Sequence, residues 1–167
     1  KLLFMGCEFA QPEEWNHDAE LNWGAAEQPA NKGVQTLIRD LNTLYRDTPA
    51  LHVNDAKPEG FGWVHNDPAQ STIGFLRYGE EGDAPVLVMC NFTPVERTGF
   101  RVGVPADGVW EEVLNSDAAI YGGGNRGNMG ESIAQEEPAD GFAQSLSLTL
   151  PPLSVVVMKK RYTVKED

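Results

Sequence analysis

Aromatic and polar side chains gather in one short stretch near the N-terminus. Trp15 and Trp23 lie there with Glu8, Asn16 and Asp18, directly after a short apolar run. A sugar ring has an apolar CH face that stacks on an indole, and its hydroxyls pair with carboxylates and amides. The stretch therefore favours a carbohydrate-binding loop. The composition supports equally well an alternative in which the tryptophans pack the loop against the helix that follows.

The other residues of catalytic or metal-binding type show no spacing that would bring them together. The three histidines and two cysteines stand far apart, so neither a metal nor a cofactor is expected. Cys7 has no obvious histidine partner and is predicted to be a small buried hydrophobe at a strand end. The glycine-rich stretch 122–128 lacks the Gly-Lys-Ser/Thr sequence of a phosphate-binding loop, which favours a structural turn.

The composition restricts the partners and the compartment. The 167 residues carry a formal net charge of −12, and so acidic a surface repels phosphate backbones but not a neutral sugar polymer. No apolar run reaches the length of a membrane span, so neither nucleic acid nor a membrane is an expected partner. Two cysteines without a disulfide framework fit a cytoplasmic protein, in which the glycosylation sequon at Asn91 is a chance match.

Two elements must position the loop that holds the tryptophans. Residues 1–6 are an apolar run ended by glycine, which predicts a buried strand. An apolar stripe from Val34 to Tyr45 has helical spacing, and the helix is expected to stop before Pro49. Because a parallel strand needs neighbours on both edges, we expect residues 1–52 to be the last β/α unit of a larger structure that begins upstream.

From about residue 53 onward the hydrophobic pattern has a period of two. Seven short strands with turn residues between them predict an antiparallel β-sandwich over residues 53–162. Within it, 116–140 is expected to be an ordered excursion, and 163–167 a frayed tail. Trp63 and Trp110 fall inside strand patterns and are expected in the core. The predicted strands are 61–64, 71–78, 86–92, 100–104, 109–114, 145–150 and 154–160.

A series of short motifs, taken in order, resembles the C-terminal part of bacterial glycogen branching enzymes, which are amylase-type glycoside hydrolases. The resemblance covers nearly the whole chain apart from the last few residues. One departure is Cys7, which stands where the family usually has asparagine, so a polar role at that position is not expected. The motifs are at 1–6, 8–11, 14–18, 33–35, 39–42, 44–46, 91–94, 115–117 and 145–153.

The resemblance implies an architecture and a reaction. The architecture is the last β/α unit of an amylase-type (β/α)8 barrel followed by an all-β antiparallel sandwich. The reaction is the retaining transfer of an α-1,4-glucan segment to a 6-hydroxyl, which makes an α-1,6 branch. The family's nucleophile, general acid and stabilising aspartate all lie upstream of Lys1, so this chain alone is expected to be inactive. Its partners would be the preceding barrel and α-1,4-glucans such as glycogen, amylose and maltooligosaccharides, and Glu8 would have a supporting role.

Three alternatives stay open. The chain could be a non-catalytic glucan-binding module in which Trp63 and Trp110 stack on sugars. It could be the same region of a debranching or trehalose-releasing amylase relative. It could also be a purely structural or assembly domain, which would bind no glucan.

Overall fold

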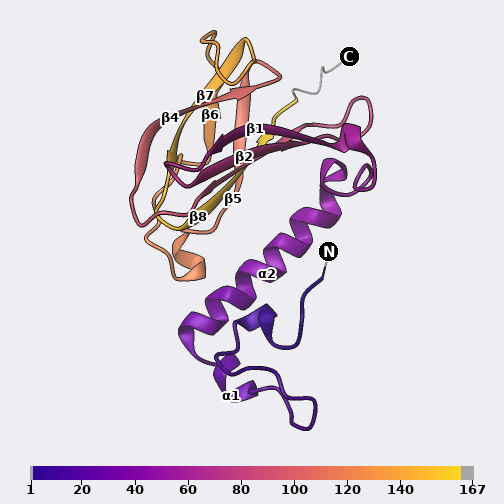
Figure 1. Ribbon diagram of the computed structural model, residues 1–167, viewed down its shortest axis with the longest axis vertical. Coiled ribbons are helices and arrows are strands. Elements are labelled where there is room, and N and C mark those ends of the chain that lie inside the picture. The colour runs from indigo at the N-terminus through magenta and orange to yellow at the C-terminus, as the bar shows by residue number, and fades with distance from the viewer. Residues whose placement is uncertain (1, 163–167) are drawn as a thin grey trace.

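The computed structural model describes residues 2–162, with a β-sandwich at one end and a polar loop at the other (Figure 1). The predicted frayed tail, 163–167, lies outside the described residues. The eight strands of the described part are β1 Phe61–Asp67, β2 Thr72–Arg77, β3 Val86–Asn91, β4 Arg97–Val104, β5 Val109–Asn115, β6 Glu131–Ile133, β7 Gln144–Leu150 and β8 Ser154–Lys160.

The strands form two antiparallel sheets that face each other. The larger sheet has the order β1-β2-β3-β8-β5-β6, and the smaller one pairs β4 with β7. The seven strands predicted from the alternating pattern are all present, although β1 continues to Asp67 and β4 begins earlier, at Arg97. The eighth, β6, lies in the 116–140 excursion and pairs with β5 over only three residues, too few to leave a periodic signal.

The main core fills the space between the two sheets. Strand β7 illustrates how the sequence directs this packing, because Leu146, Leu148 and Leu150 alternate with smaller polar residues and are at most 1% exposed. Trp110 is fully buried in the same layer. The buried members of this core are Leu76, Leu87, Met89, Val102, Val104, Trp110, Leu146, Leu148, Leu150, Val156 and Met158.

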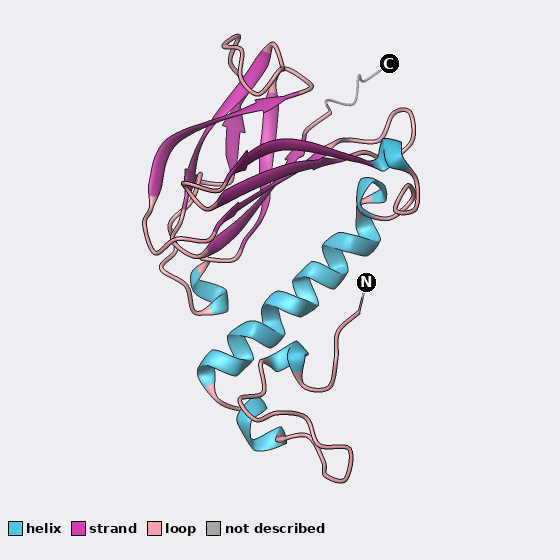
Figure 2. Cartoon of the chain, in the orientation of Figure 1, coloured by secondary structure: helices cyan, strands magenta, loops and turns pink. Residues whose placement is uncertain are grey.

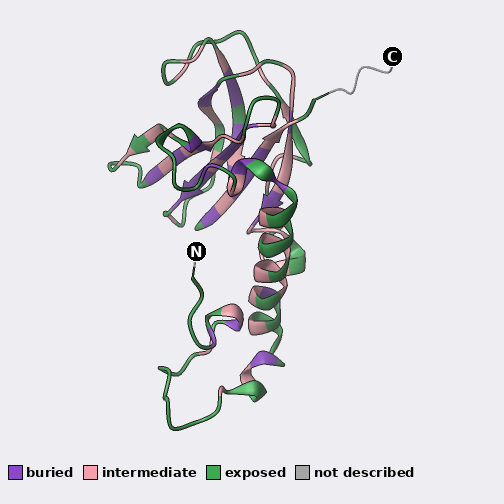
Figure 3. Ribbon diagram, turned by 90° about the vertical axis from the view of Figure 1, so that its right-hand side faces the viewer, coloured by how far each residue is buried: buried purple, intermediate pink, exposed green. Residues whose placement is uncertain are grey.

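Helix α2 packs against the outer face of the larger sheet through Leu37, Leu41 and Leu44, and its N-terminal part extends beyond the strands (Figure 3). It spans Pro29–Asp47 and has a proline in its first turn, where the missing N–H costs nothing. It ends as predicted before Pro49, because Thr48 is extended (φ −125°, ψ 95°), as a residue preceding proline prefers. Its stripe, which includes Leu41, packs against a second cluster of buried residues. That cluster comprises Ala50, Val86, Leu114 and Val157.

No strand is formed over residues 2–6, the described part of the strand predicted at 1–6. Residues 2–4 belong to no strand, the next two form a turn, and Leu2 is 89% exposed. A parallel strand is stabilised by hydrogen bonds to neighbours on both sides, and the described residues provide none for this segment. Helix α2 therefore packs on the sandwich instead of on the first strand. The short helices are η1 Cys7–Phe9, α1 Trp23–Ala26, η2 Pro49–Leu51, η3 Pro58–Gly60 and η4 Ala119–Tyr121.

Candidate functional site

The loop at residues 8–23, which runs from η1 to the first residue of α1, projects beyond the N-terminal end of α2, away from the sheets (Figure 2). It is anchored at its base by Phe9, which is completely buried. The side-chain amide of Asn31, in the first turns of α2, donates hydrogen bonds to the carbonyl oxygens of Phe9 (2.8 Å) and Ala10 (3.0 Å). The loop is thus fastened to the helix at one point and open to solvent beyond it.

Both tryptophans of the loop use part of their surface for packing and expose the rest. Trp23 begins α1, and its ring lies 5.9 Å from that of Phe9. Trp15 meets the ring of Phe4 edge to face at 5.2 Å. Because the two indoles are 57% and 45% exposed, each retains a surface on which a sugar could stack.

The predicted polar residues make local contacts and do not form one cluster with the tryptophans. The Asn16 side-chain oxygen accepts a hydrogen bond from the Asp18 backbone N–H at 3.0 Å, which closes a tight turn. The Asp18 carboxylate lies 3.2 Å from Nε2 of His17, and both side chains are exposed. Glu8 is half-buried in η1.

Gln11, Glu13 and Asn22 also shape this loop, and sequence reasoning gave them no such part. Asn22 donates its backbone N–H to the Gln11 side chain (2.8 Å) and its side-chain amide to Glu13 (2.9 Å). It also caps α1, since its Oδ1 accepts from the Ala25 N–H at 3.0 Å. An asparagine directly before a helix is a recognised cap signal, but its cross-loop partners leave no mark in the sequence.

A second group of aromatic rings, exposed at Phe61 and Trp63 and half-buried at Phe75, lies on the outer face of β1 and β2. The Phe61 ring is 5.0 Å from that of Trp63 and stacks on that of Phe75 at 5.4 Å. The prediction that both sandwich tryptophans are core residues is confirmed for Trp110 and wrong for Trp63, which is 64% exposed. The reason is that β1 is an edge strand and α2 covers the central strands only.

An apolar groove of about 580 Å³ separates α2 from the outer face of the larger sheet. Its walls include Leu41 and Leu44 from the helix and Val88 and Val155 from the sheet, and Leu3 of the N-terminal segment lines it as well. This exposed apolar surface continues into the N-terminal residues. Leu2, Leu3, Phe4 and Met5 are all exposed.

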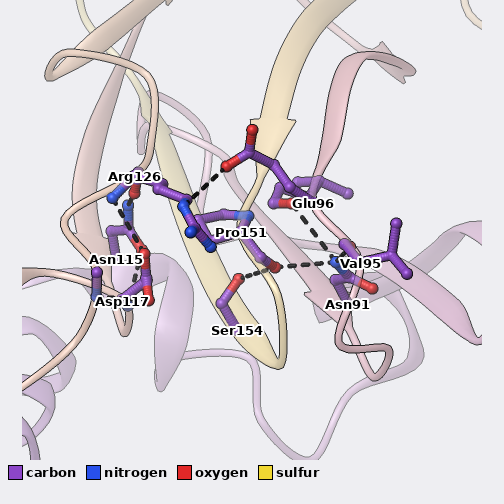
Figure 4. Close-up of polar contacts among 10 residues, drawn as sticks. Asn91, Val95, Glu96, Asn115, Asp117, Arg126, Pro151 and Ser154 are labelled. Carbon is purple, nitrogen blue, oxygen red and sulfur yellow. Dashed lines mark hydrogen bonds and ion pairs between the residues drawn. The ribbon is translucent and has the colours of Figure 1, made fainter.

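The sequon asparagine has a structural role at one end of the sandwich (Figure 4). Asn91 is 1% exposed, and its amide donates to the carbonyl oxygens of Val95 (2.8 Å) and Pro151 (2.9 Å). Its Oδ1 accepts from the N–H and the hydroxyl of Thr93. The side chain therefore holds the ends of β3 and β7 together, which accounts for the residue without any glycosylation.

The cysteines are both unpaired, and they differ in exposure. Cys90 is buried, and burial raises the pKa of its thiol. Cys7 is exposed, so its prediction as a buried hydrophobe is wrong, because the strand that would have buried it is not formed. Across residues 2–162, no three His, Cys, Asp or Glu side chains are placed to hold a metal ion. None of the helices in that range is long and apolar enough to span a membrane.

Comparison with known proteins identifies relatives along nearly the whole chain. Two proteins named 1,4-alpha-glucan branching enzyme GlgB, from Jannaschia sp. (strain CCS1) and Pseudomonas putida, are 69% and 53% identical over 95% of this chain. The protein named 1,4-alpha-glucan branching enzyme GlgB 1, from Xanthomonas euvesicatoria, is 58% identical over the same share. The chain spans only 22–23% of the length of these relatives.

A structural comparison and a family comparison add to these relatives. A solved structure of MutB, an inactive double mutant in complex with isomaltulose, matches 75% of this chain and 17% of its own, with a TM-score of 0.43 and 21% identity. Residues 63–161 match the family described as "Alpha amylase, C-terminal all-beta domain", and they comprise β2–β8 and most of β1. The chain therefore belongs to the family of alpha amylase C-terminal all-beta domains.

Proposed function

We propose that this chain is the C-terminal part of a 1,4-α-glucan branching enzyme. Such an enzyme transfers α-1,4-glucan segments to 6-hydroxyls and so forms α-1,6 branches. The observation that carries the proposal is the 69% identity, over 95% of this chain, to a protein of that name. The identity extends well upstream of the sandwich, so it also favours a branching enzyme over a debranching or trehalose-releasing relative.

Within that enzyme, residues 1–52 would complete the catalytic barrel and residues 53–162 would form the sandwich. The exposed N-terminal apolar residues support this division, because Leu2 and Phe4 are of the type that a barrel strand buries. The groove beside α2 supports it too, since an apolar surface of this kind is normally covered by a partner. The preceding part of the polypeptide is that partner.

The chemistry would lie upstream and the glucan groove would be completed here. A retaining glycosyl transfer needs a nucleophilic carboxylate and a carboxylic acid about 5 Å apart. The resemblance assigns these groups to earlier barrel segments, so the chain alone would not branch glucan. Its contribution is the loop with Glu8, Trp15, Asn16, Asp18 and Trp23, whose half-exposed indoles support sugar stacking.

The test compares this chain with the longer polypeptide that includes the upstream barrel. Each is incubated with amylose, and new α-1,6 linkages are counted by proton NMR and by the chains that isoamylase releases. The longer polypeptide should form branches and the 167-residue chain should form none. Hydrolysis of amylose without transfer by the longer polypeptide would instead identify a hydrolytic relative.

A second candidate function, glucan binding by the sandwich itself, is favoured by one observation. Phe61, Trp63 and Phe75 form a contiguous aromatic surface, and Trp63 is 64% exposed. Trp63→Ala should weaken maltoheptaose binding at least tenfold in calorimetric titrations. Phe92→Ala, which removes a 57% exposed ring elsewhere, is the matched control and should leave binding unchanged. Equal affinities of the wild type and Trp63→Ala would exclude this function.

We also propose that the partner is a neutral α-glucan and that the compartment is the cytoplasm. An acidic chain of net charge −12 is compatible with a neutral glucan such as glycogen, amylose or a maltooligosaccharide. Both cysteines being free supports a reducing compartment, the cytoplasm. Fractionation of the native host, with the antigen recovered in the cytoplasmic or the periplasmic extract, decides between the compartments.

A further inference from the structure

The 116–126 loop of the sandwich is built around Asp117 (Figure 4). Its carboxylate accepts hydrogen bonds from the backbone N–H groups of Gly124 (2.9 Å) and Arg126 (3.0 Å), and its carbonyl oxygen accepts from that of Asn125 (2.6 Å). Asn115 adds a fourth restraint, because its side-chain amide donates to the Arg126 carbonyl oxygen at 2.6 Å. These bonds give the loop one defined shape and a defined position for the short helix η4 at its centre.

Helix η4 contacts α2 at two points. The Tyr121 hydroxyl donates a hydrogen bond to the Asp40 carboxylate at 3.0 Å. About two turns earlier along the helix, Gly33 is buried against the Tyr121 carbonyl oxygen, and a Cβ at position 33 would overlap that oxygen. Tyr121 of the sandwich therefore contacts the helix through both its side chain and its backbone.

The same end of α2 holds the loop that carries the tryptophans. Asn31, two residues before Gly33, donates its amide to the carbonyl oxygens of Phe9 and Ala10. The Phe9 ring in turn packs against Trp23. A shift of α2 relative to η4 would therefore move Asn31 and, with it, the base of the loop.

We propose that Tyr121 is a positioning residue for the glucan-binding loop. Its contacts with Gly33 and Asp40 fix the position of α2 relative to the sandwich, and α2 in turn fixes the position of the base of that loop. This inference rests on the proposed function for its effect on glucan, although the coupling itself does not. It gives the sandwich a part in substrate binding that needs no contact between the sandwich and the sugar.

The protonation states of Tyr121 and Asp40 maintain their hydrogen bond over the physiological pH range. Burial, and then the Asp40 carboxylate, raise the pKa of Tyr121 to about 12, so the phenol remains a donor. The hydrogen bond from Arg39, and more weakly that from Tyr121, lower the pKa of Asp40, so the carboxylate remains an acceptor.

The test is made on the longer polypeptide with the variant Tyr121→Phe, which lacks only the Tyr121 hydroxyl. In Tyr121→Phe, the KM for amylose should rise about threefold to tenfold, which corresponds to one net hydrogen bond, with kcat changed less than twofold. Asp40→Ala should behave like Tyr121→Phe, whereas Asp40→Asn, which keeps an acceptor oxygen, should recover most of the wild-type KM. Tyr78→Phe, a half-buried tyrosine of the sandwich, is the matched control and should behave as the wild type.

A second measurement does not depend on activity. Hydrogen exchange of backbone amides 7–23 should be at least threefold faster in Tyr121→Phe than in the wild type, with exchange in β3 and β8 unchanged. Unchanged exchange in 7–23, or an equal fall of kcat in Asp40→Ala and Asp40→Asn, would overturn the inference. A wild-type polypeptide that makes no α-1,6 branches would overturn the proposed function instead, and the exchange result would still decide the coupling.

Discussion

Two tryptophans of the sandwich form a matched pair for testing how burial translates into stability. Trp110 is fully buried, and its indole N–H donates to the Ala106 carbonyl oxygen at 3.1 Å. Trp63 is 64% exposed and packs on the rings of Phe61 and Phe75. Both have the same side chain in strands of the same sheet, so Trp110→Ala and Trp63→Ala differ mainly in the surroundings of the ring.

The expected losses differ by a factor of about three. Truncating a fully buried tryptophan costs about 3–5 kcal/mol, and the Ala106 carbonyl left without its donor favours the upper end. For Trp63, about a third of a surface of about 250 Å² is buried, worth about 2 kcal/mol at 25 cal/mol per Å². Compactness of the unfolded chain reduces this to about 1–2 kcal/mol.

Urea unfolding of the chain, followed by far-UV circular dichroism, measures both losses without relying on tryptophan fluorescence. The midpoint should fall much further for Trp110→Ala, and its melting temperature should drop by roughly 6–20 °C. The slope of free energy against urea should stay constant in both variants. Equal losses in the two variants would refute the reasoning, because they would mean that exposure in the fold does not govern the cost.

Three further predictions follow from the polar and ionisable groups. Asn91→Ala should destabilise the chain by about 2–4 kcal/mol in the same assay, because it leaves buried carbonyl groups without donors; a loss under 1 kcal/mol would contradict its structural role. The pKa of Tyr121 is raised from 10.0 to about 12, so its contribution to the stability of the fold is complete below pH 10 and is lost between about pH 10 and 12. Tyr121→Phe should remove the tyrosinate absorbance step near pH 12. An unchanged step would contradict the assignment of that pKa to Tyr121. Exposed Cys7 should react fast with a thiol reagent and Cys90 only on unfolding, so two fast thiols would contradict the burial of Cys90.

Periodicity in the sequence was sufficient for seven of the eight described strands and for α2, but it missed β6 and predicted a strand at 1–6 that is absent from the described residues. Local backbone geometry fixes the direction of successive side chains in a strand or a helix. This explains the alternation at Leu146, Leu148 and Leu150 and the helical stripe through Leu41. The helix end before Pro49 is likewise a local steric effect. These features hold regardless of what the rest of the chain does, which is why they could be predicted.

The sugar-binding role of the candidate loop stays a prediction, and the contacts that arrange the loop were not predictable from the sequence. Trp15 and Trp23 both lie in the loop and are partly exposed, as carbohydrate stacking requires, and both also pack on neighbouring rings. The anchor that holds the loop, from Asn31 to Phe9 and Ala10, joins residues more than twenty positions apart. No spacing rule relates such partners, because they meet only through the folded path of the chain.

The sequence by itself determined seven of the eight strands in the described part, the long helix and the antiparallel class of the sandwich. That Trp15 and Trp23 bind sugar stays a prediction. Only the tertiary structure decided that Trp63 is exposed while Trp110 is buried, that Asn91 closes the end of the sandwich, and that Tyr121 clasps α2. Local pattern states which side chains share a face of an element. Whether another layer covers that face, and which distant group meets each polar atom, depends on segments far apart in sequence, and so it is decided only when they pack.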